Sequence, residues 1–189
     1  MLEYIDYVNI IKKMSNKDSN YNWNNGNNFL GKNGIRKTKL RPLGLDKKIA
    51  KENLLILKKI FDKYKLEFFL IDGTLLGAIR DKDFIYDDND TDICINYSDL
   101  ELLVKCVPDL IEQGLEPLRI SNNEISFMKN NEYIDIEFLK EKTRFTENLD
   151  IIEFCGESFN IPSNVNEYLT ICYGNWREKS DKHNWTVPT

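Results

Sequence analysis

The sequence is poor in the residues that build common metal-stabilised folds. It has only one histidine, and its four cysteines include no Cys-x-x-Cys pair. A structural zinc site needs Cys and His ligands at short, regular spacings, so a zinc-stabilised fold is excluded. A transmembrane helix needs about 18 consecutive apolar residues, and no stretch of the sequence comes close to that length. The start of the chain also lacks the basic region of a secretory signal. We therefore expect a cytoplasmic protein with reduced, buried thiols.

The chain also lacks an excess of positive charge. It carries 26 Lys and Arg against 31 Asp and Glu, a net charge of −5. Broad electrostatic binding to nucleic acid is therefore not expected. The 189 residues, 41% of them hydrophobic, predict one globular domain with a small appendage. Ten Phe, nine Tyr and three Trp supply a core and exclude a wholly disordered chain.

Residues 1–45 form the predicted appendage. Residues 2–14 have the apolar spacing of a short amphipathic helix. Residues 15–34 are dense in Asn and Gly, which favour turns and predict a loop. Residues 35–45 are locally basic, and they either approach the next helix through solvent or face a phosphate. The main domain is expected over 46–189.

Helical and strand patterns mix along the main domain. Asp46 is a predicted N-cap for a helix that ends near residue 65, and Gly114 is a predicted C-cap. Further elements are indicated by apolar periodicity: strands at 66–72, 92–97, 116–121, 124–130, 132–140 and near 151–156, and helices at 73–80, 99–114 and 163–174. Several strands are joined by tight turns, so the predicted fold class is α+β with a mixed sheet.

A glycine-threonine turn follows the first predicted strand. Gly73 and Thr74 stand where this strand enters a short helix. Glycine lets a ligand approach the backbone closely, and a helix N-terminus offers free N–H groups to a phosphate. Arg80, at the end of the same helix, has a guanidinium that can fork onto phosphate oxygens. These three residues are the predicted phosphate contacts.

An acidic pair follows the turn. Asp90 and Asp92 are separated by one residue at the start of a strand, so both carboxylates face the same way. Asp135 lies in a later apolar strand and supplies a third acid. Close carboxylates need a cation between them, and Mg²⁺, with Mn²⁺ as the alternative, prefers such ligands. The cluster predicts metal-assisted phosphoryl or nucleotidyl transfer. Asp88 either supports these acids or is solvated.

The acidic run also matches the opening of an EF-hand loop, from Asp88 to Asp92. An EF-hand needs glycine at its sixth position and glutamate at its twelfth. Ile93 and Asp99 occupy those positions, and a strand follows where the loop should continue. An EF-hand calcium site is therefore excluded.

Three segments together resemble a known family. GTLLGAIRDKDFIYDDNDTDICI, YIDIEFL and IPSNVNEYLTICYGNWREKSDKHNW are similar to the signature blocks of LicD-type phosphocholine transferases and the related fukutin-type proteins. The resemblance covers about residues 50–188. It implies a nucleotidyltransferase-like mixed β-sheet flanked by helices. It also implies that Asp90 and Asp92 bind Mg²⁺, that Asp135 is a further ligand or the base, and that Gly73, Thr74 and Arg80 contact a nucleotide diphosphate.

The resemblance also implies a reaction. Family members move a phospho-alcohol such as phosphocholine from a cytidine diphosphate carrier to a sugar hydroxyl of a surface glycan, which can be lipid-linked at the inner membrane surface. Lys182 and His183 either form a solvated tail or a basic clamp over the diphosphate. Tyr86 and Asp87 replace the family's Pro-Trp, and Asn89 replaces an acid. Two alternatives therefore stay open: nucleotidyl transfer from a nucleoside triphosphate to a small molecule, protein or tRNA, and a degenerate scaffold subunit.

Overall fold

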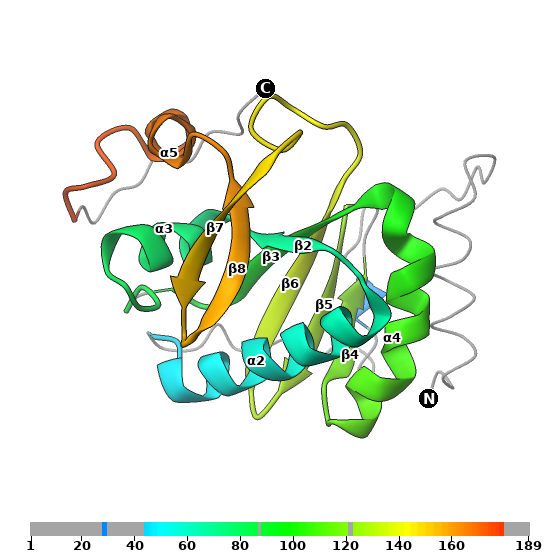
Figure 1. The fold of residues 1–189 in the computed structure, drawn as a ribbon. Coiled ribbons are helices and arrows are strands. Elements are labelled where there is room, and N and C mark those ends of the chain that lie inside the picture. The colour runs from blue at the N-terminus through cyan, green and yellow to red at the C-terminus, as the bar shows by residue number, and fades with distance from the viewer. Residues whose placement is uncertain (1–27, 30–43, 87, 121–122, 180–189) are drawn as a thin grey trace.

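The computed structural model describes residues 28–29, 44–86, 88–120 and 123–179 (Figure 1). The predicted helix over 2–14 and most of the Asn-rich loop lie outside these residues, as do Lys182 and His183. The helices are α2 (Lys47–Tyr64), α3 (Asp72–Arg80), α4 (Leu100–Glu112) and α5 (Val165–Tyr173). The strands are β1 (Asn28–Phe29), β2 (Phe68–Leu70), β3 (Thr91–Asn96), β4 (Glu116–Ile120), β5 (Glu124–Lys129), β6 (Glu132–Leu139), β7 (Leu149–Phe154) and β8 (Glu157–Pro162).

The strands form one mixed sheet in the order β1-β4-β5-β6-β3-β2-β8-β7. β3 pairs with β6 and β2 pairs with β8 in parallel, while the other pairs are antiparallel. α2 and α4 pack side by side, and α3 and α5 lie toward the β8–β7 end of the sheet (Figure 1). The predicted α+β class with a mixed sheet flanked by helices is therefore confirmed.

The predicted helix after Asp46 is confirmed as α2. The Asp46 carboxylate accepts hydrogen bonds from the N–H groups of Lys48 and Ile49 at 3.1 and 3.2 Å, which caps the first turn. Leu54, Leu57, Phe61 and neighbouring apolar residues are fully buried in the main core. The helix ends at Lys65, whose φ of 57° places it in the left-handed region.

The sequence predicts the first strand of the β7–β8 hairpin but not the second. Phe154 pairs with Glu157, so Cys155 and Gly156 form a two-residue loop, and both have positive φ (57° and 85°). Such loops are usually signalled by Asn-Gly or Asp-Gly. The Cys-Gly sequence gave no such signal, and β8 was therefore missed.

The central strands divide the side chains between two faces of the sheet. Ile93 and Ile95 of β3 belong to the main core, which draws residues from all four helices. Cys94 points the other way and packs in a small cluster with Phe69 and Ile71. Because side chains alternate along a strand, Asp92 shares the face of Cys94. The acidic residues therefore lie on the face turned away from the main core.

The sequence predicts no membrane-spanning helix and predicts reduced, buried thiols. None of the helices in the described part of the chain combines the length and apolar character needed to span a membrane. All four cysteines are free thiols, and only Cys155 is not buried. Burial raises the pKa of Cys172 and Cys155 to about 11 and that of Cys106 to about 12, so these thiols are poor nucleophiles at neutral pH.

Candidate active site

Three aspartates meet where the chain enters β3. One carboxylate oxygen from each of Asp88, Asp90 and Asp92 lies within 4.8 Å of the others, and all three residues are half-buried. Asp92 belongs to β3, while Asp88 and Asp90 lie in the loop before it. The structure therefore brings together the predicted pair and adds Asp88. The donor set consists of carboxylate oxygens, which suits a hard divalent cation.

Asp135 reaches the same place from β6. It lies directly opposite Asp92 in the parallel β3–β6 register, and its side chain is only 7% exposed. Ser126 of β5, its partner in the antiparallel register on the other side, donates a hydrogen bond to Asp135 Oδ1. Asp135 therefore has a fixed orientation beside the three clustered aspartates. It is not one of the three whose oxygens converge.

The electrostatics of the acids follow from burial and crowding. Burial, followed by the charges of Asp88 and Asp135, raises the pKa of Asp90 to about 7, against a hydrogen bond from Tyr133 that lowers it. Burial and the neighbouring acids, Asp90 first, raise the pKa of Asp92 well above its usual range. Like charges this close disfavour full ionisation, and a bound cation would remove that penalty.

The N-terminus of α3 holds the acids in place. A Cβ atom on Gly73 would lie 2.0 Å from Asp88 Oδ2, so any other residue there would push that carboxylate out of its present position. Thr74 is fully buried, and its hydroxyl accepts a hydrogen bond from the N–H of Asp92 at 2.9 Å. Two of the three residues predicted to contact phosphate, Gly73 and Thr74, thus lie against the acidic cluster. Their contact with a nucleotide remains a prediction.

Arg80 lies at the other end of α3, about 12 Å of helical rise from Asp72. Its side chain is 8% exposed, and its guanidinium donates to both Asp81 carboxylate oxygens, from Nε at 3.0 Å and from Nη2 at 2.9 Å. Nη1 also donates to the carbonyl of Trp176 at 3.5 Å. Its hydrogen bonds and charge hold the pKa of Asp81 below its usual range. Arg80 therefore joins α3 to the segment after α5, and its role toward phosphate remains a prediction.

Sequence reasoning did not single out Ser126 or Tyr133 and left Asp88 undecided. Asp88 offered one signal, since it continues the two-residue spacing of Asp90 and Asp92. Ser126 offered none, because a small polar residue within EISFMK is ordinary for a half-exposed strand. Its role depends on the register with Asp135, which only the folded sheet reveals.

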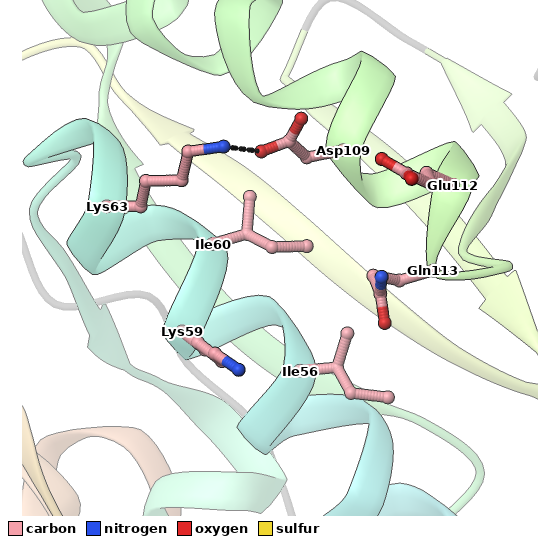
Figure 2. Close-up of a pocket in the computed structure, with 7 residues that line it drawn as sticks. All are labelled: Ile56, Lys59, Ile60, Lys63, Asp109, Glu112 and Gln113. Atoms are coloured by element: carbon pink, nitrogen blue, oxygen red, sulfur yellow. Dashed lines mark hydrogen bonds and ion pairs between the residues drawn. The ribbon is translucent and has the colours of Figure 1, made fainter.

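A hollow of about 520 Å³ lies elsewhere, between α2 and α4. Figure 2 shows Ile56 and Ile60 of α2 facing it, with Lys63 and Asp109 joined by an ion pair of 2.6 Å at one end. None of the clustered aspartates lines this hollow. The acidic cluster, rather than this groove, is therefore the candidate active site.

Comparison with known proteins shows which family the sequence matches. The sequence model of the family described as "LicD/FKTN/FKRP, nucleotidyltransferase domain" matches residues 65–168. This range includes Asp88, Asp90, Asp92 and Asp135. A crystal structure of ANT(2″)-Ia in complex with adenylyl-2″-tobramycin is similar, at 14% identity and a TM-score of 0.46, over 61% of this chain and 70% of that one. A solution structure of the antibiotic-resistance factor ANT(2″)-Ia is similar at 13% identity and a TM-score of 0.48, over 62% of this chain and 66% of that one. No curated protein matches the sequence.

Proposed function

Because the chain belongs to the LicD/FKTN/FKRP nucleotidyltransferase-domain family and is therefore a transferase, we propose that it moves a phospho-alcohol, of the phosphocholine kind, from a CDP-activated donor to a sugar hydroxyl of a surface glycan. The observation that carries the proposal is the meeting of Asp88, Asp90 and Asp92, at the start of β3, with Asp135 on the adjoining strand β6. We also propose that residues 46–189 are the catalytic domain. A cytoplasmic location against the inner membrane surface would suit a lipid-linked acceptor.

A divalent cation fits this set of residues. Asp88, Asp90 and Asp92 would hold it, since their oxygens converge, and the raised pKa values of Asp90 and Asp92 reflect charge that a cation would offset. Mg²⁺ commonly takes one or two carboxylates together with substrate phosphates, and Mn²⁺ accepts similar ligands. When bound, the ion would supply neutralisation of the charge on the donor diphosphate.

The chain's own residues account for the rest of the proposed step. The acceptor hydroxyl oxygen attacks the phosphorus next to the alcohol, and the anhydride bond to CMP breaks. Asp135 takes up the hydroxyl proton, with its carboxylate held by Ser126. Thr74 and Gly73 keep Asp92 and Asp88 in position, so the acids need no reorganisation when substrate arrives. Arg80, Lys182 and His183 are the remaining candidates for contact with the diphosphate.

A thermal-shift experiment tests the proposal. The full chain with Mg²⁺ is heated with CDP-choline, CDP-glycerol, CDP-ribitol, CTP, UTP, ATP or GTP. A ligand at a hundredfold excess over Kd stabilises the native state by about 2.7 kcal/mol. We expect a Mg²⁺-dependent shift with a CDP ester and release of CMP on transfer.

The matched variants are Asp90→Ala/Asp92→Ala, which should abolish the shift, and Asp150→Ala, an exposed acid on β7 that should preserve it. A shift with nucleoside triphosphates only, with pyrophosphate released, would replace the proposal by nucleotidyl transfer. No shift with any ligand would favour the scaffold alternative.

A further inference from the structure

A second cavity lies against the loop that carries the acids. It has a volume of about 540 Å³, within the range of small-molecule sites. Its walls come from three parts of the chain, the segment before and into α2, the loop before β3 and the β5–β6 turn: Gly44, Leu45, Asp46, Ile49, Tyr86, Asn130, Asn131 and Glu132.

The cavity borders the loop that carries two of the acids. The N–H of Leu45 donates to the carbonyl of Asp88 at 3.0 Å, so one wall is bonded to the acid loop. Another wall is the start of β6, where Glu132 accepts from the N–H of Asp46 at 3.0 Å. Asp135 lies three residues further along the same strand. Side chains alternate along a strand, so Glu132 and Asp135 point to opposite faces of the sheet. The cavity therefore lies beside the acid loop on the α2 side of β6, and an acceptor seated in it would reach the acids around the edge of the sheet.

The lining favours a neutral, hydroxyl-rich molecule. The Tyr86 side chain is 77% exposed, so its ring offers a flat face that is not used by the core. Asn130 and Asn131 occupy the turn with φ of 53° and 65°, are exposed, and carry amides that both donate and accept hydrogen bonds. The described lining includes the acids Asp46 and Glu132 but neither Lys nor Arg, which disfavours a phosphate.

We infer that this cavity is a carbohydrate subsite, in which a sugar ring of the acceptor stacks on Tyr86 and its hydroxyls hydrogen-bond the paired asparagines. An aromatic ring buries the apolar face of a pyranose, while amides satisfy its hydroxyls. The inference deepens the proposed function, since only that proposal makes the sugar an acceptor. Binding of the sugar itself needs neither donor nor metal.

Ligand-observed saturation-transfer NMR on the full chain tests the inference. The probes are the methyl glycosides of galactose, glucose, N-acetylgalactosamine and N-acetylglucosamine. We expect saturation transfer to at least one glycoside and at least a fivefold loss in Tyr86→Ala. Tyr86→Trp should retain the signal, because it keeps an aromatic face. Ile151→Ala removes an equally exposed apolar side chain from β7, 71% exposed, and should change nothing.

No transfer to any glycoside would overturn the inference, and so would equal transfer in Tyr86→Ala. A Tyr86-dependent signal with choline chloride instead would make the cavity a cation site, and one with CMP would make Tyr86 a platform for the nucleotide base. The donor thermal shift is measured separately, so a failed subsite and a failed transferase proposal give different patterns.

Discussion

The hydroxyl of Thr74 accepts a hydrogen bond from the backbone N–H of Asp92 at 2.9 Å, eighteen residues along the chain. Thr74 is in the first turn of α3, and Asp92 is the second residue of β3. Because Thr74 is fully buried, water cannot replace this bond. The position of the acid is therefore set by a helix that carries no acid of the cluster.

Replacing Thr74 by Val should weaken both the fold and the metal site. Valine has nearly the same shape but leaves the Asp92 N–H without its acceptor, at a cost of about 1–3 kcal/mol. Denaturant unfolding measures the loss of stability, and calorimetric titration with Mg²⁺ measures the loss of affinity. Thr74→Ser keeps the hydroxyl and should retain the affinity. Unchanged Mg²⁺ binding in Thr74→Val would show that the bond does not position Asp92.

Gly73→Ala should act on the metal site through Asp88. The new Cβ would lie 2.0 Å from Asp88 Oδ2, so the carboxylate must move away. We expect Gly73→Ala to lower Mg²⁺ affinity about as much as Asp88→Ala does. The double variant should lose no more than either single one, because both remove the same ligand. Additive losses in the calorimetric titration would mean that Gly73 acts independently of Asp88.

Stability without metal should fall as the pH rises from about 4 to about 7. The folded-state pKa of Asp90 is raised to about 7, and that of Asp92 is raised too. Between the unfolded and folded pKa values the native state binds more protons than the unfolded state, so the free energy of unfolding decreases with pH. Denaturant unfolding at several pH values, with chelator present, measures this slope.

The same linkage predicts that Mg²⁺ binds more tightly as the pH rises, because binding requires ionised acids. Asp90→Asn should flatten the pH dependence of stability. Asp150→Ala, which changes an exposed acid on β7, should leave it intact. A metal-free protein whose stability increases steadily from pH 4 to pH 7 would contradict the raised pKa values.

Arg80→Lys separates two roles of Arg80. The arginine forms two hydrogen bonds with Asp81 and one with the Trp176 carbonyl, and lysine cannot reproduce this planar fork. If Arg80 acts by joining α3 to the segment after α5, Arg80→Lys and Asp81→Asn should destabilise the protein similarly, by about 1–3 kcal/mol, and leave the donor KM nearly unchanged. A donor KM that rises in Arg80→Lys alone would assign the guanidinium to the diphosphate.

The parts of the fold that depend on local signals were predictable. The cap at Asp46, the apolar periodicity of α2 and the alternation in β3 and β6 are all visible in the sequence, and they predicted the strands that carry Asp92 and Asp135, while Asp90 lies in the loop just before β3 rather than in the strand. Asp88 could be seen but not interpreted, because its role depends on the approach of Gly73. The partners of Arg80 follow from the path of the chain after α5, which periodicity does not encode.

The parallel pairing of β3 with β6 has a consequence for how the protein becomes competent. Parallel neighbours need a crossover, and here it comprises α4, β4 and β5. A nascent chain that has passed Asp92 therefore carries crowded acids but no Asp135 beside them. The site is completed only by a contact distant in sequence, of the kind that forms late in folding. Competence to bind the cation should consequently report the assembly of the whole central sheet.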